Sequence, residues 1–184
     1  MKLNKIKSLC KAAGRVIIYN ELGESGELRR QWIGTGTAMY ILEGLPILGP
    51  GNIPVLLGLE GNALNKVKIT QEKMPEDIFT GDYDAEEPAL TVIPCTVNAG
   101  GRDLVLFRPQ FQVWALAADE LGPAYAQALT CKMRWTPDGV PYFVIFRGMF
   151  LTAILFNEQS RMLDEVSRNG LSLWMNWLRK TDAG

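Results

Sequence analysis

The stretch from Asp103 to Phe156 constrains the fold of this chain most, because apolar segments and turn signals alternate along it. It predicts a strand at Leu104–Phe107 and then a helix over Pro109–Leu121, with Gly122-Pro123 as its stop signal. Three more strands are expected at Ala128–Trp135, Val140–Phe146 and Met149–Phe156, the first two joined at Thr136-Pro137-Asp138-Gly139. This order of elements predicts an α+β domain.

The predicted helix at 109–121 has an apolar stripe at helical spacing and a second apolar face beside it. The stripe consists of Phe111, Trp114, Ala115, Ala118 and Leu121. Val113, Leu116 and Ala117 form the second face, which we expect to be buried against another part of the protein or a second subunit. A homo-oligomer is therefore expected.

The first 70 residues predict a helix followed by strands. Apolar residues recur at helical spacing from Leu3 to Ala13, and Gly14 is placed to end this helix. Strands are expected at Arg15–Asn20, at Arg30–Leu42 as one long element, and as short pieces at Val55–Leu59 and Val67–Thr70. A loop rich in Gly and Pro occupies 44–54.

The middle of the chain is acidic. Residues 72–88 carry most of the local negative charge, are interrupted by Pro75 and Gly81, and predict an exposed loop or a single helical turn. Within them Asp82, Asp84, Glu86 and Glu87 are candidate ligands for a divalent cation. They lack the glycine and terminal glutamate of a calcium loop, so a solvated loop is the favoured interpretation. A strand resumes at Leu90–Val97.

Composition excludes several kinds of catalytic site. Histidine is absent, which removes Ser-His and Cys-His nucleophile pairs and most zinc hydrolase sites. Cys10, Cys95 and Cys131 are far apart and odd in number, so they predict buried apolar residues rather than disulfides or a zinc site. No phosphate-binding loop or nucleophile elbow occurs. We expect no enzyme activity, no cofactor and no metal.

Charge is nearly balanced overall, with 19 Lys and Arg against 20 Asp and Glu, but the N-terminal region is basic. The first predicted helix and the residues after it carry Lys2, Lys5, Lys7, Lys11 and Arg15, which are candidates for contact with DNA phosphates. A lysine face that is simply solvated is the alternative. The longest apolar stretch, Val140–Phe156, is shorter than the about 20 residues of a membrane-spanning helix and contains Arg147. No signal peptide is evident, so we expect a cytoplasmic protein without membrane contact.

The second half of the chain resembles the last part of the bacterial DNA sliding clamp, the beta subunit of DNA polymerase III. The resemblance lies in a helix, a strand, an Asp-Gly hairpin with a following Pro, and two more strands. Here these are Gln110–Leu121, Leu129–Trp135, Asp138-Gly139-Val140-Pro141, Tyr142–Phe146 and Phe150–Phe156. Each domain of that family contains two such units, which implies one clamp-like domain over residues 1–156. Its halves would be about 1–70 and 90–156, joined through the acidic loop at 72–88.

Two features depart from the family pattern. A clamp domain opens with a strand, whereas this chain begins in the predicted helix at Leu3–Ala13. Clamp helices line the DNA-filled hole with basic side chains, and the predicted helix at 109–121 has none. Only the first helix therefore has the charge expected of a DNA-facing element.

The C-terminal segment 157–184 lies beyond the point where a clamp chain ends. Met162, Leu163 and Val166 begin a helical stripe, and 171–178 is nearly all apolar, which predicts a helix that packs back on the sheet. Alternatively the segment docks on a partner, since its core resembles the Leu-Ser-Leu-Phe peptide by which clamp partners bind a clamp. The partner contact would then consist of Leu171, Leu173, Trp174 and Trp177.

These observations lead to three hypotheses about function. The first is a non-catalytic accessory protein of DNA replication, encoded by a phage or mobile element, that self-associates or docks on a replication protein, with DNA as a further partner. The second is an oligomeric structural or adaptor protein of the same fold without DNA contact. The third is a carboxylate-dependent metal enzyme that uses the acidic loop.

Overall fold

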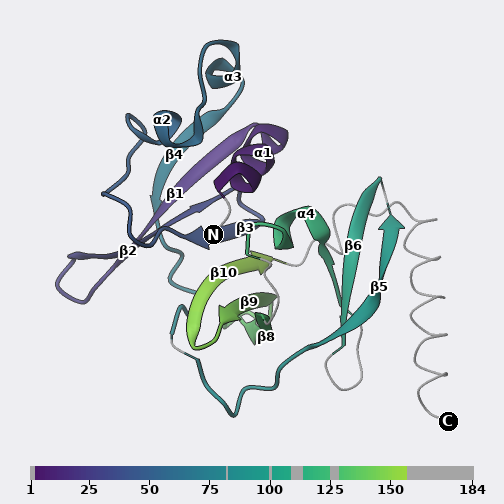
Figure 1. Cartoon of the computed structure of the whole chain (residues 1–184). Helices are drawn as coiled ribbons and strands as arrows, with labels where there is room; N and C mark the ends of the chain where they lie inside the picture. Colours follow the sequence, from purple (N-terminus) through teal and green to yellow (C-terminus); the bar gives the residue numbers. More distant parts are fainter. Residues whose placement is uncertain (1–2, 82, 100, 109–113, 125–128, 157–184) are drawn as a thin grey trace, which may run out of the picture.

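The computed structural model describes residues 3–81, 83–99, 101–108, 114–124 and 129–156. Within these ranges the chain is an α+β domain with two sheets, which confirms the predicted class (Figure 1). The helices are α1 (Leu3–Ala13), α2 (Ile53–Leu57), α3 (Asn62–Asn65) and α4 (Ala118–Leu121). The larger sheet has seven strands in the order β4-β1-β2-β3-β10-β9-β8, and the smaller has three in the order β5-β6-β7.

The strands of the larger sheet come from both ends of the described chain. They are β1 (Arg15–Leu22), β2 (Leu28–Gly34), β3 (Ala38–Ile41), β4 (Lys68–Lys73), β8 (Leu129–Trp135), β9 (Pro141–Arg147) and β10 (Phe150–Phe156). The smaller sheet consists of β5 (Thr91–Ala99), β6 (Arg102–Arg108) and β7 (Trp114–Ala117). All pairs are antiparallel except β1 with β4, which is parallel.

One structural unit occurs twice in the chain. Helix α1 precedes the antiparallel strands β1, β2 and β3, and helix α4 precedes the antiparallel strands β8, β9 and β10. The two units join where β3 pairs with β10, with Tyr40 opposite Ala153 and Met39 opposite Ile154. The two helices contact each other. In both units a helix of the described chain precedes antiparallel strands, and the division of the domain into halves at about 1–70 and 90–156 stays a prediction.

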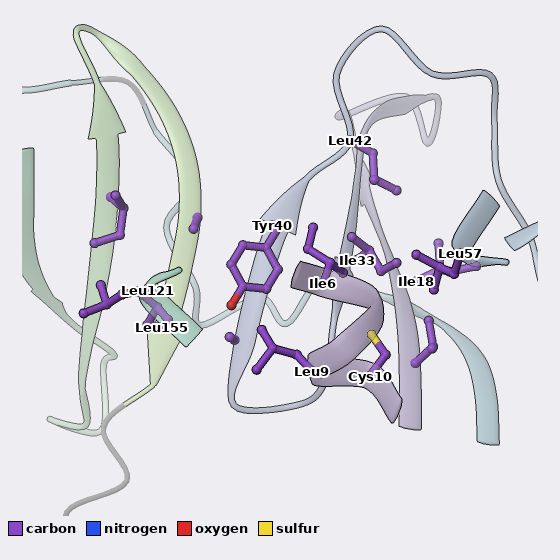
Figure 2. Packing of buried hydrophobic residues seen from close by; sticks show 14 of the residues in the cluster. Ile6, Leu9, Cys10, Ile18, Ile33, Tyr40, Leu42, Leu57, Leu121 and Leu155 are labelled. Carbon is purple, nitrogen blue, oxygen red and sulfur yellow. The ribbon is translucent and has the colours of Figure 1, made fainter. Parts of the chain in front are cut away.

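The core is divided by the larger sheet. On one face, α1 packs its buried residues Ile6, Leu9 and Cys10 into a cluster that includes Ile18 and Ile33 of the sheet (Figure 2). Because side chains alternate along a strand, Ile17 and Tyr19 point to the other face, where they belong to a second cluster. Burying a large apolar side chain contributes about 1.5–3 kcal/mol, so both faces contribute to stability.

Several predicted boundaries are confirmed. Helix α1 ends at Gly14, which adopts the left-handed conformation (φ 62°) expected of a C-cap. The hairpin of β8 and β9 closes through Gly139 (φ 77°), and β10 follows after Gly148 (φ 62°). The strands predicted at 67–70 and 90–97 correspond to β4 and β5.

The prediction of one long strand at Arg30–Leu42 is wrong, as is that of a strand at Val55–Leu59. The first region is a hairpin of β2 and β3, because Gly36 adopts a left-handed turn (φ 96°) and the Thr35 N–H donates to the Ala38 carbonyl. The second is the short helix α2, with Pro54 in its first turn and left-handed Gly58 (φ 54°) as its C-cap. Its apolar run of five residues was too short for periodicity to separate helix from strand.

The predicted helix over Pro109–Leu121 is also wrong. Trp114–Ala117 is strand β7, paired with β6, and the described helix α4 covers only Ala118–Leu121, while 109–113 lie outside the described residues. Alanine and leucine favour helices, but pairing with β6 buries Leu116 and Ala117 on opposite faces of a sheet. The stripe from Phe111 to Leu121 is therefore not one helix face.

The acidic segment is not simply an exposed loop. Residues 74–81 and 83–89, which we call the strap, follow β4 and lie against the face of the larger sheet opposite α1. Ile78 of the strap is buried in the second core cluster, and Met74 and Tyr83 pack against it. Near its end, Ala89 forms an isolated bridge with Lys132 of β8.

Two cations of β8 hold the strap. Arg134 donates to both carboxylate oxygens of Glu87 at 2.9 and 3.1 Å, and to the carbonyls of Phe79 and Gly81 at 3.0 and 3.2 Å. The Lys132 ammonium contacts the carbonyl of Asp84 and lies 4.0 Å from the centre of the Tyr83 ring. Both side chains are buried, so the strap replaces the water that would otherwise solvate them.

Replacing Arg134 with methionine is expected to destabilise the fold by about 2–4 kcal/mol, because it removes a largely buried ion pair and the guanidinium that donates to two strap carbonyls. The free energy of unfolding from urea titration measures this. Arg147→Met at the exposed end of β9 is the control, expected to cost at most about 0.5 kcal/mol. Equal effects of the two substitutions would show that Arg134 does not anchor the strap.

Alkaline pH is expected to destabilise the fold partly through Cys10. Burial raises the pKa of this thiol from 9.0 to about 12, so the folded state retains the proton more tightly than the unfolded state. The contribution of this thiol to the free energy of unfolding is complete below pH 9.0 and is lost as pH rises toward about 12. In urea titrations between pH 9 and 11, the free energy of unfolding of Cys10→Ala should fall by about 1.4 kcal/mol less per pH unit than that of the parent chain. Parallel pH profiles of the two proteins would contradict this.

Candidate functional site

The residues predicted to contact phosphate do not form a single surface. Lys5 extends from α1 toward α4, where its ammonium lies 3.1 Å from the position that a Cβ would take on Gly122. Lys7 extends to the other flank of α1, 2.8 Å from the Cβ position of Gly58 at the end of α2. Lys11, four residues after Lys7, shares the same side of the helix and is exposed.

Arg15 belongs to a different part of the molecule. It begins β1 two residues before Ile17, and alternation places its side chain on the strap face of the sheet rather than on the α1 face. Its guanidinium lies against the turn between β2 and β3, 2.1 Å from the Cβ position of Gly36. Lys2 lies outside the described residues. The prediction that Arg15 joins the lysines of α1 in one contact is therefore not supported by its position.

The lysines of α1 and Arg15 are available to pair with an external anion. Among the residues that the structure describes, no carboxylate oxygen lies within 4.0 Å of the charged groups of Lys5, Lys7, Lys11 or Arg15. Each can therefore meet an external anion without first breaking an ion pair within this part of the chain.

A groove runs between α1 and α4. It has a volume of about 350 Å³, and its lining is mostly apolar, with the ammonium of Lys5 and the carboxylate of Asp119 at its sides. The lining residues are Lys5, Ser8, Leu9, Ala12, Ala118, Asp119 and Gly122. Its size falls in the range of ligand-binding clefts, so it can hold a few apolar side chains of a partner.

Beneath the groove, a polar network fixes α4 to β3. The Glu120 side chain is buried, and its carboxylate accepts hydrogen bonds from Thr37 at 2.7 Å and from Arg102 at 3.3 Å. The Tyr40 hydroxyl donates to the Glu120 carbonyl at 2.5 Å, and burial next to Glu120 raises the pKa of this phenol. Arg102 also pairs with Asp119 at 2.7 Å. The α4 side of the groove is therefore held rigidly.

Sequence reasoning did not identify Arg102, Asp119 and Glu120 as connected residues. Adjacent acids are typical of the first turn of a helix, where they oppose the positive end of its dipole. Asp119-Glu120 do lie in the first turn of α4, so this signal favours a helix start near Ala118 rather than Pro109. The partner Arg102 has no local signal, because it comes from a different strand.

The acidic loop does not assemble a cation site in the part that is described. Glu87 is paired with Arg134, and the Asp84 carboxylate accepts the N–H of Glu86 at 2.8 Å. Among the described residues, no group of three or more acidic or cysteine side chains is arranged to hold a metal ion. Asp82 lies outside these residues, and so do the predicted partner-binding residues Leu171, Leu173, Trp174 and Trp177.

Cys10 and Cys131 are free thiols buried in the core, as predicted, while the side chain of Cys95 lies outside what is described. Burial raises the pKa of both described thiols, so they remain protonated and unreactive near neutral pH. None of the described helices has the length and apolar character needed to cross a membrane.

Comparison with known proteins does not indicate a function, so the geometry of the domain is the basis for assigning one. No protein-family model matches this chain, and neither a curated protein nor a solved structure matches it.

Proposed function

We propose that this chain is a non-catalytic accessory protein of DNA replication, built as one sliding-clamp-like domain, that acts by binding protein and DNA. The repeated unit carries this proposal. A helix followed by three antiparallel strands occurs twice, the two helices touch, and the units share one sheet through β3 and β10. A clamp domain is implied by the resemblance to contain two helix-plus-strand units, so this arrangement supports the proposal.

The proposed DNA contact consists of Lys5, Lys7 and Lys11 of α1, which have no ion pair within the described residues. Lys7 and Lys11 share one side of the helix and lie close enough to meet neighbouring phosphates, while Lys5 reaches the groove side. Arg102 pairs with both Asp119 and Glu120 and so compensates one of the two negative charges that α4 places near these lysines. The contact is small and lacks base-reading features, which favours weak, salt-dependent binding.

The triple variant Lys5→Ala, Lys7→Ala, Lys11→Ala is expected to weaken binding to double-stranded DNA. Each phosphate contact releases about one counterion, so the slope of log affinity against log salt should fall by about two to three. Fluorescence anisotropy with a labelled duplex at several salt concentrations measures both changes.

A charge-matched control separates a specific contact from general attraction. Arg29, Lys73 and Arg147 are exposed cations of β2, β4 and β9, and their replacement by alanine removes the same net charge. DNA contact through α1 predicts that only the α1 triple variant loses affinity. Equal losses in both triple variants, or no loss in either, would remove DNA from the proposed function.

The groove between α1 and α4 favours a second candidate function, that of an adaptor without DNA contact. Its apolar lining suits a partner side chain, and the ammonium of Lys5 suits a carboxylate of that partner. If the variants of the α1 lysines bind DNA as the parent chain does, the groove is tested next. Replacing Ala12 with glutamate should block the groove, so that a partner captured by the parent chain is no longer captured by the variant. Light scattering after size-exclusion chromatography then establishes whether that partner is a second copy.

A further inference from the structure

The larger sheet ends in two edge strands, β8 and β4, and the described chain covers only β8. There the Leu90 N–H donates to the Cys131 carbonyl at 2.7 Å, and Ala89 forms a bridge with Lys132. Strand β4 lies beside β1 at the other end of the sheet, and within the described residues β1 is its only pairing partner (Figure 1). An uncovered strand edge presents backbone donors and acceptors with which another strand can pair.

Two hydrogen bonds determine which backbone groups of β4 point away from the sheet. The Lys68 N–H donates to the Gly14 carbonyl at 2.9 Å, and the Met74 N–H donates to the Asn20 carbonyl at 2.8 Å. The N–H and C=O of one residue point to the same side of a strand, and this side alternates along the chain. The even-numbered residues of β4 therefore bond to β1, and the odd-numbered ones point outward. The outward-facing residues are Ile69, Gln71 and Lys73.

This alternation restricts how a second copy of β4 can pair with the first. In an antiparallel pair, the residues that exchange hydrogen bonds must both point outward, so odd-numbered residues have to face odd-numbered residues. When Ile69 faces Gln71 of the other copy, Thr70 lies on the two-fold axis between the copies. Lys68 of each copy then lies opposite Glu72 of the other, so the same opposite-charge pair occurs twice.

The other registers are less favourable. A shift by two residues in one direction places Lys68 opposite Met74 and Ile69 opposite Lys73, which gives no ion pair. A shift by two in the other direction leaves only residues 68–70 of each strand in the pair. Aligning the two strands end to end places Lys68 opposite Lys73, and it opposes outward residues with residues that already bond to β1. Charge and hydrogen bonding therefore select the same register.

Lys68 and Glu72 are placed to make this contact. Both are exposed, and neither takes part in an ion pair within the described residues. The Glu72 carboxylate accepts the Thr70 hydroxyl at 3.0 Å, which holds it on the side of β4 that the register requires. Lys68 and Glu72 would form a pair that exchanges no backbone hydrogen bonds, where opposite Cα atoms are about 4.5 Å apart and side chains are closest.

We infer that two copies of this chain associate through β4, antiparallel about a two-fold axis at Thr70, with Lys68 of each copy opposite Glu72 of the other. The two larger sheets become continuous across this contact. A single strand pair is a small interface, so the dimer is expected to be weak and to dissociate on dilution. The inference does not rest on the proposed function, because a single chain can make the DNA contact of α1.

Sedimentation velocity of the full chain over a range of micromolar concentrations tests the contact. The parent chain should dimerise reversibly. Lys68→Glu and Glu72→Lys should each weaken the dimer roughly tenfold or more, because each variant places like charges opposite each other twice. An equimolar mixture of the two variants should dimerise again, since both cross-strand pairs then join opposite charges. The exchange variant with both substitutions should dimerise as the parent chain does.

Lys73→Glu is the matched control, because it makes the same charge change on β4 outside the pairs of Lys68 with Glu72. Its dimer should be as strong as that of the parent chain, and circular dichroism establishes that each variant is folded. A parent chain that stays monomeric would overturn the inference, and so would single charge variants that dimerise as the parent does. Two further results would also overturn it: a mixture that stays monomeric, and an equal loss in Lys73→Glu.

Discussion

The antiparallel pairing of β3 with β10 is the interaction on which the rest of the structure depends. It joins strands that are more than 100 residues apart, and without it the larger sheet would divide into a four-stranded and a three-stranded piece, each with an apolar face open to water. The pairing brings Ala38 and Leu155 together and continues the cluster under α1 from one unit to the other. Closing so long a loop is entropically costly, and burial on both sides of the joined sheet offsets that cost.

The same junction determines where the two helices meet. Tyr40 lies on β3, and its hydroxyl holds the backbone of α4 through Glu120, while Thr37 holds the carboxylate. Removing either hydroxyl would delete a hydrogen bond to a buried acceptor of Glu120, so the polar contacts specify the position of α4 more strictly than apolar packing alone. The groove between α1 and α4 is therefore a consequence of the pairing of β3 with β10.

Local signals in the sequence were sufficient where one residue decides the structure. Gly14 and Gly139 end or turn elements by conformation, and α1 and the β8–β9 hairpin were predicted through signals of this kind. Prediction failed at Trp114–Ala117, where helix-forming residues pair with β6, and at the strap, where an acidic segment is held by Arg134. In both cases the deciding partner lies elsewhere in the chain. The candidate site shows the same limit, since charge identified the α1 lysines but only the sheet placed Arg15 on the other face.

The buried cations of β8 and the lysines of α1 differ in what their charges do. On the strap face, Lys132 and Arg134 are buried, and their charges are committed to the carbonyls and the carboxylate of the strap. On the helix face, Lys5, Lys7 and Lys11 have no such partner within the described residues. A polyanion approaching the domain gains little from charges that are already compensated, whereas free ammonium groups attract it over about a Debye length of 8–10 Å. The lysine charges of α1 therefore lie beside the groove that α4 completes.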